Sequence, residues 1–291
     1  MRLSFADVNT FFSGLLLITV ALFFGATTDL MGQSKGVRGD TVPAVPPLDE
    51  AALRERIQAL RAPQPGGDYQ LEFDLRHMPR RAPTVYYRGR LLGTWNEQGP
   101  VYRVILWPDE GQAHRDAVQL LITTGAQPQC WIVEPGGDIR QINPEAWFEP
   151  IMPGLIYTPA DLAMAFLDWP MERYAGSTRV SSRITHLIDF TPSQSAREAY
   201  PDLTRLRLAL DANFNAPVRV EWSGGRGDVL RAMNIVDFRK VDEQWIAGSV
   251  DMIDSLSRAR DRFEVTDARF GLRYSREVFS PEALVDMPPV Q

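Results

Sequence analysis

The last third of the chain constrains the fold most, because apolar and charged side chains alternate there over a long stretch. Within residues 203–274, Leu206, Leu208 and Leu210 are separated by charged or small residues, and the same alternation returns around Val220. Successive side chains of a β-strand point to opposite faces of a sheet. The pattern therefore predicts a meander of long antiparallel strands.

Earlier segments extend this sheet. Residues 69–76 alternate Tyr, Leu, Phe and Leu with polar side chains, which is typical of a half-buried strand. Glycine and proline delimit further strand-like runs at close spacing, without room for crossover helices, so we expect hairpins. In all we expect about eleven strands, in a mainly β (α+β) fold with a curved antiparallel half-barrel. The expected strands after the first are residues 84–94, 101–107, 117–124, 129–134, 138–142, 179–190, 203–212, 217–223, 229–241, 244–253 and 262–274.

Three helices are predicted to accompany the sheet, the last a terminal turn at Pro281–Val285 that Ser280 caps. Asp49 caps an amphipathic N-terminal helix in which Leu53, Ile57 and Leu60 share one face. A second helix begins in mid-chain after Thr158. Residues 191–201, by contrast, are expected to form a polar loop.

The mid-chain helix is short, capped and apolar. Pro159 stands at its first position and Asp161 at its third, and Pro170 ends it. Leu162, Phe166 and Trp169 form its apolar stripe.

Three segments of the meander, Asn215–Trp222, Asp237–Ala247 and Arg262–Asp267, resemble the LolA/LolB-like outer-membrane lipoprotein-sorting proteins in their order and character. The resemblance extends over roughly residues 50–285. It implies an incomplete barrel and an amphipathic helix before the first strand. It also implies that a mid-chain helical segment, residues 150–169, covers the mouth of the barrel as a lid; the alternative is that this helix plugs the core. It also implies a sorting arginine, for which Arg88, Arg90 and Arg103 are equal candidates.

The resemblance further implies an exported carrier that binds lipid or the acyl chains of lipoproteins in a covered cavity and moves them within the cell envelope. Its partners would be a lipid or acylated lipoprotein and a membrane-bound donor or acceptor protein, with no cofactor. The alternative is a membrane-anchored envelope sensor or scaffold that uses the half-barrel to bind a protein. The residues expected to line the cavity and lid are Leu71, Phe73, Leu75, Val101, Trp107, Trp131, Leu162, Phe166 and Trp169.

The N-terminus predicts export. Residues 11–25 are almost entirely apolar and shorter than a comfortable membrane span, which favours a signal peptide and leaves an uncleaved anchor as the alternative. We expect residues 1–30 to be this segment, residues 31–48 a linker rich in glycine and proline, and residues 49–287 a single LolA/LolB-like half-barrel domain. The expected location is the periplasm or cell envelope.

Composition argues against several other classes of function. The 291 residues carry a net charge of −6, without the basic face that nucleic acid requires. The single cysteine, Cys130, allows no intramolecular disulfide and no Cys-x-x-Cys metal site.

Candidates for chemistry are few, so we expect neither an enzyme nor a metal protein. His186 and Asp189 lie three apart in a predicted strand and so face opposite sides, which argues against a triad with Ser181 or Ser182. One polar cluster is compatible with a hard cation, although a solvated hairpin loop explains it better. This cluster comprises Asp109, Glu110, His114 and Asp116.

Overall fold

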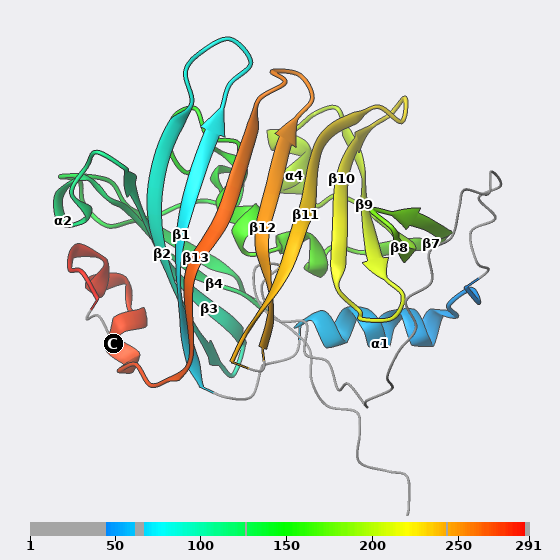
Figure 1. The fold of residues 1–291 in the computed structure, drawn as a ribbon, viewed down its shortest axis with the longest axis horizontal. Coiled ribbons are helices and arrows are strands. Elements are labelled where there is room, and N and C mark those ends of the chain that lie inside the picture. Colours follow the sequence, from blue (N-terminus) through cyan, green and yellow to red (C-terminus); the bar gives the residue numbers. More distant parts are fainter. Residues whose placement is uncertain (1–44, 62–66, 126, 243, 289–291) are drawn as a thin grey trace, which may run out of the picture.

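One antiparallel sheet of thirteen strands organises the molecule (Figure 1). The computed structural model describes residues 45–61, 67–125, 127–242 and 244–288. The fold is mainly β, and its sheet is curved and open, as predicted. Its strands are β1 (Asp68–Met78), β2 (Val85–Asn96), β3 (Gly99–Pro108), β4 (Val118–Thr123), β5 (Gln129–Val133), β6 (Arg140–Gln141), β7 (Met171–Val180), β8 (Arg183–Phe190), β9 (Leu203–Asp211), β10 (Pro217–Gly224), β11 (Val229–Val241), β12 (Gln244–Asp254) and β13 (Arg260–Leu272).

The strand order shows how the chain builds the sheet. It runs β6-β5-β4-β3-β2-β1-β13-β12-β11-β10-β9-β8-β7, so chain neighbours pair as hairpins within each half. The first and last strands join in the middle, where Leu71 lies opposite Ala268 and Leu75 opposite Phe263. The two halves therefore meet along β1 and β13, and the mid-chain segment between β6 and β7 connects the two outer edges.

The number of strands differs from the prediction of about eleven, chiefly because residues 171–190 form a hairpin. Ser181 and Ser182 make its turn with φ of 48° and 68°. Positive φ is uncommon for serine, so nothing in the composition announces a turn between two strand-like runs. The single strand predicted at residues 179–190 is thus wrong at its start, and β7 was missed.

The helices are α1 (Glu50–Arg61), α2 (Ala113–Asp116), α3 (Pro159–Leu162) and α4 (Gln194–Ala199). The prediction for α1 is confirmed: Leu53, Ile57 and Leu60 are buried, and the Asp49 carboxylate accepts a hydrogen bond from the Ala52 amide at 2.8 Å. Figure 1 shows α1 lying across one end of the strands. The polar loop predicted at residues 191–201 is wrong in part, because it contains α4, capped by Ser193.

The two faces of the sheet are covered by different segments. The main core lies on the concave face, beneath the mid-chain residues. On the other face, two smaller apolar clusters pack β2–β5 against the C-terminal 3-10 helices η3 (Arg276–Phe279) and η4 (Pro281–Val285).

None of the helices in the described part of the chain combines the length and apolar character needed to cross a bilayer. The predicted signal peptide or anchor at residues 1–30 and most of the linker at residues 31–48 lie outside the described residues.

Candidate functional site

The concave face of the sheet is continuously apolar. Alternate residues of β1, namely Leu71, Phe73 and Leu75, are buried on it. The Phe73 ring stacks on Phe263 of β13 with ring centroids 4.3 Å apart. Strands β8 to β12 continue the same surface with Ile188, Phe190, Leu206, Leu208, Leu210, Val220, Trp222, Met233, Ile235, Ile246, Val250 and Met252.

Residues 144–169, here called the cover, pack on this face. They contain the 3-10 helix η1 (Ala146–Phe148), the helix α3 and a second 3-10 helix, η2 (Ala165–Asp168). The apolar concave face of the sheet is here called the wall. The Phe166 ring contacts the Phe190 and Trp222 rings of the wall edge-on, with centroids 6.1 and 6.5 Å away. The cover thus fills the concavity with its own side chains.

The predicted mid-chain helix is confirmed at its start and wrong in its length. Thr158 caps α3, and its side chain and that of Asp161 form a reciprocal capping box. Helix α3 then ends at Leu162, because Met164 adopts a left-handed conformation with φ of 47°. The segment turns there and continues as η2, so Phe166 and Trp169 follow a bend.

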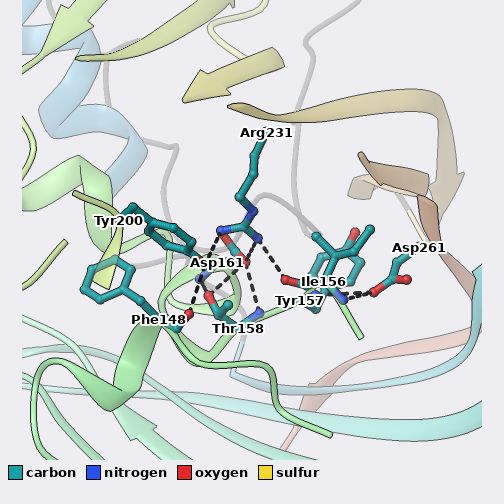
Figure 2. A network of polar contacts seen from close by, with 8 residues as sticks. All are labelled: Phe148, Ile156, Tyr157, Thr158, Asp161, Tyr200, Arg231 and Asp261. Atoms are coloured by element: carbon teal, nitrogen blue, oxygen red, sulfur yellow. Dashed lines mark hydrogen bonds and ion pairs between the residues drawn. The ribbon is translucent and has the colours of Figure 1, made fainter. Parts of the chain in front are cut away.

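A buried ion pair joins the cover to the sheet. Arg231 of β11 and Asp161 of α3 are 4% and 5% exposed, and their charged groups lie 2.7 Å apart. The guanidinium also donates to the Ile156 carbonyl at 2.8 Å and to the Tyr200 hydroxyl at 3.2 Å (Figure 2). Burial is the largest single influence and would lower the pKa of Arg231, but Asp161, Tyr200 and Asp254 together outweigh it and raise the pKa.

A second buried carboxylate fastens the neighbouring residues of the cover. Asp261 of β13 is fully buried and accepts hydrogen bonds from the Ile156 and Tyr157 amides at 2.5 and 3.3 Å. Its other oxygen lies 2.6 Å from Nδ1 of His77, which comes from β1. Burial raises the pKa of Asp261, although His77 and the two amides oppose this effect. Figure 2 shows the two attachments on either side of Ile156 and Tyr157.

The structure divides the nine predicted site residues between two faces. Leu71, Phe73 and Leu75 lie on the concave face, and the cover supplies Leu162, Phe166 and Trp169. Val101, Trp107 and Trp131 instead lie on the outer face, where they pack in the clusters around the C-terminal segment. Alternation explains the difference, because Tyr102, Val104 and Leu106 of β3 occupy the concave side and Val101 and Trp107 the other.

The candidate arginines also lie on the outer face. Arg103 is buried against the C-terminal segment, where it donates to the Val278 and Ala283 carbonyls. Arg88 pairs with Asp109 and Arg90 with Glu72. The arginine that holds the cover is Arg231, which sequence reasoning missed. Its one signal is a charge at a position of β11 that shares a face with Met233 and Ile235.

Pockets remain at the margins of the cover. An apolar one of about 290 Å³ lies between β5 and the cover, lined by Ile142, Trp147, Phe148, Ala165 and Trp169 among others. A smaller one of about 150 Å³ beside α1 shares Ala163 and Asp168 with it. A third, of about 310 Å³, has a mixed polar and apolar lining and lies beside Arg231 and His77.

The other polar candidates have structural partners. His186 lies 3.1 Å from the Tyr174 hydroxyl, whereas Asp189 pairs with Arg207 and Arg173. In the loop cluster, Asp109 pairs with Arg88 and Asp116 with Arg115. Across the described residues, no group of three or more histidine, cysteine or carboxylate side chains is arranged to hold a metal ion.

Comparison with known proteins shows the fold. No protein family matches the sequence, and no curated protein sequence is significantly similar to it. Solved structures do match. A domain assigned as an outer membrane lipoprotein-sorting protein from Vibrio parahaemolyticus is 14% identical with a TM-score of 0.67, over 80% of this chain and 97% of that one.

Two further structures agree with it. A DUF1329 family protein from Desulfovibrio piger is 13% identical with a TM-score of 0.61, over 76% of this chain and 92% of that one. A LolA superfamily protein from Nitrosomonas europaea is 15% identical with a TM-score of 0.58, over 81% of this chain and all of that one. The chain therefore has the LolA-like fold, as its resemblance to that family predicts.

Proposed function

We propose that this protein is an exported, non-catalytic carrier that binds lipid or the acyl chains of lipoproteins on its concave face and moves them within the cell envelope. The observation that carries the proposal is the division of the core into two parts. An apolar wall belongs to the sheet, and a separate segment, the cover, lies on that wall and is joined to it by buried polar contacts at Arg231 and Asp261.

The physical requirement for carriage fits this arrangement. Each methylene left in water costs roughly 0.8 kcal/mol, so an acyl chain of about 16 carbons needs an enclosed site. The apolar pocket of about 290 Å³ lies just below the usual range for small-molecule sites, about 300–1,000 Å³. A long chain would therefore displace the side chains of the cover and take their place on the wall.

Displacement of the cover exchanges one apolar surface for another. The acyl chain would replace Leu162, Phe166 and Trp169, so the apolar burial on the wall is largely conserved. The polar attachments then set the preference for the closed form. A binding partner or a membrane can shift the equilibrium between the closed and open cover when the closed state is favoured by only a few kcal/mol.

The proposal is tested by binding measured in a matched pair of variants. Asp161→Asn removes the carboxylate that pairs with Arg231, whereas Glu149→Gln neutralises an exposed carboxylate in the same segment. We expect a fluorescent fatty acid to bind the full protein, more tightly after Asp161→Asn and unchanged after Glu149→Gln. Native mass spectrometry of the purified protein checks for co-purified lipid. An interior that is empty and rejects the probe in all three proteins would contradict carriage.

A second candidate is an anchored sensor or scaffold that binds a protein, and the filled concavity favours it. The edge strand β7 adds a place for such a partner, because none of its side chains that the structure describes is buried. An exposed edge can accept a further strand. N-terminal sequencing of the exported protein separates the two candidates: a shuttle requires removal of residues 1–30, whereas an anchored sensor retains them.

A further inference from the structure

The cover supplies the charge that balances a buried arginine of the sheet. Arg231 projects from β11 under the cover, between the rings of Trp222 and Tyr200, whose centroids lie 5.2 and 5.4 Å from its guanidinium carbon. Both Asp161, which forms the ion pair, and Ile156, whose carbonyl accepts a hydrogen bond, belong to the cover. Arg231 therefore depends on the closed cover for its anionic partner.

Opening the cover for an acyl chain would separate this pair. Asp161 would leave with α3, while Arg231 would stay on the sheet between two aromatic rings. A buried charge that loses its partner is strongly destabilised. A ligand with an apolar chain alone would leave that charge without its ion-pair partner. A ligand that also carries an anion would restore it.

The third pocket, with its mixed lining, lies where such an anion would reach Arg231. It encloses about 310 Å³ and is bounded by Pro79 and Arg80 after β1, by residues 154–156 of the cover and by Arg231. His77 lines it as well. Because Nδ1 of His77 faces Asp261, its Nε2 lies on the side of Gly154, at 3.9 Å from where a Cβ atom on that glycine would stand.

The surroundings of this pocket become more positive by one charge when the cover leaves. Arg80 is exposed at its margin, and Asp254 contributes a carboxylate that accepts hydrogen bonds from Ser257. Asp261 lies behind His77 and is engaged by it. With Asp161 in place, its charge offsets that of Arg231. Without it, Arg80 and Arg231 face Asp254, and Arg231 has lost the carboxylate of its ion pair beside the apolar wall.

We infer that the ligand of this carrier is an anionic amphiphile, whose carboxylate or phosphate group replaces Asp161 as the partner of Arg231. Its head group occupies the pocket beside Arg231 and its chain takes the place of the cover on the concave wall. The inference rests on the proposed carrier function. It implies that uncharged glycerides and esters are poor ligands.

A fluorescent fatty acid and its methyl ester test the inference, because they differ in one charge. At a pH where the acid is ionised, we expect the full protein to bind the acid about tenfold more tightly than the ester, the effect of one charge-assisted hydrogen bond. Arg231→Met should reduce this ratio to near one without weakening the ester. Equal binding of both probes by the unmodified protein would overturn the inference and leave carriage intact. Binding of neither would overturn the proposed function itself.

Further variants keep the test valid if Arg231→Met does not fold. Arg80→Gln changes an exposed residue at the pocket margin and should lower the ratio a few-fold. Arg54→Gln, on the exposed face of α1 at the other end of the strands, should leave it unchanged. An equal loss in both variants would point to overall charge and overturn the assignment.

Inorganic phosphate distinguishes a lipid head group from a free anion. We expect phosphate alone to leave amide exchange in residues 156–164 unchanged, and the fatty acid to accelerate it, because the chain and the anion are both needed to displace the cover. Opening of the cover by phosphate alone would assign the pocket to a free anion and overturn the inference that the ligand is an amphiphile.

Discussion

At the scale of single residues, charged side chains in the core mark where the cover meets the wall. Position 231 lies on the apolar face of β11, and a hydrophobic side chain there would serve packing better. Replacing a buried ion pair by well-packed apolar residues is often neutral or stabilising. The intact Arg231–Asp161 pair therefore contributes less to stability than the loss of one partner alone would cost. A role in holding a removable segment explains why the pair is present.

Asp161→Asn should lower the free energy of unfolding by about 3 kcal/mol, because Arg231 stays buried without a carboxylate. Thr158 also loses part of its capping box. The measurement is urea unfolding, with amide exchange to locate the effect in residues 156–164. Glu149→Gln is the control and should behave like the unmodified protein. A decrease below about 1 kcal/mol would mean that Asp161 adds little to closure.

His186 predicts a pH dependence of stability. It is buried beside Tyr174, and burial followed by the charge of Arg56 lowers its pKa below the ordinary value of 6.5. The unfolded chain then binds a proton more readily than the folded one. The contribution of His186 is therefore fully present above pH 6.5 and is lost as the pH falls from there through the folded pKa.

Unfolding free energies measured at a series of pH values around and below 6.5 test whether stability falls on acidification. The stability of the unmodified protein should decline on acidification below pH 6.5, and His186→Gln should flatten this part of the curve. His114→Gln, at an exposed position of α2, serves as the matched control. Identical slopes in the unmodified protein and His186→Gln would contradict the assignment.

At the scale of elements, glycines of β2 make room for the large rings of β1. Gly89 lies opposite Phe73 and Gly93 opposite Tyr69 in the register of the two strands. A Cβ atom on Gly89 or Gly93 would stand 2.0 or 1.9 Å from the facing ring. These rings are buried, and the Phe73 ring also stacks on Phe263, so they have little freedom to move aside.

Gly93→Ala should therefore destabilise the protein by about 3 kcal/mol, at the upper end of overpacking. The effect is measured by thermal or urea unfolding. Gly225→Ala is the matched control, since a Cβ atom there meets its nearest neighbour at 3.6 Å in an exposed turn. If both variants are equally stable, the β1–β2 packing is looser than the contacts indicate.

The elements predictable from sequence are those whose pattern is local. The alternation in β1 and β9–β13, the amphipathic α1 and the cap at Thr158 all follow from neighbouring residues. The hairpin at Ser181–Ser182 and the bend at Met164 depend on positive φ in residues that seldom adopt it. The site was only partly predictable for another reason: alternation shows that two faces differ, but tertiary contacts decide which face the cover occupies.

Long-range partners were beyond sequence reasoning altogether. Arg231 meets Asp161 across 70 residues, and His77 meets Asp261 across 184. Neither pair has a spacing that marks it. The His77–Asp261 contact arises because β1 and β13 lie side by side in the centre of the sheet, and the Arg231–Asp161 contact because the cover packs against β11.

At the scale of the whole molecule, each face of the sheet carries its own covering segment. The cover lies on the concave face, and η3 and η4 pack on the outer face, where Leu284 is buried against Val101, Leu121 and Val133. Arg103 holds this C-terminal segment by donating to the Val278 and Ala283 carbonyls at 3.0 and 2.7 Å. Burial lowers the pKa of Arg103 to about 10, so it remains charged at neutral pH.

The two coverings should act independently, because their anchoring residues share no contacts. Arg103→Met removes the hydrogen bonds to the Val278, Ala283 and Asp286 carbonyls and to the Gln119 side chain, and should cost about 2 kcal/mol. Combined with Asp161→Asn, the losses should add to within about 0.5 kcal/mol. Amide exchange should rise in residues 276–288 in the first variant and in residues 156–164 in the second. Arg88→Met, an exposed arginine on the same outer face, controls for loss of charge. A coupling above about 1 kcal/mol would show instead that the sheet transmits strain between its faces, in which case release of the C-terminal segment would also loosen the cover.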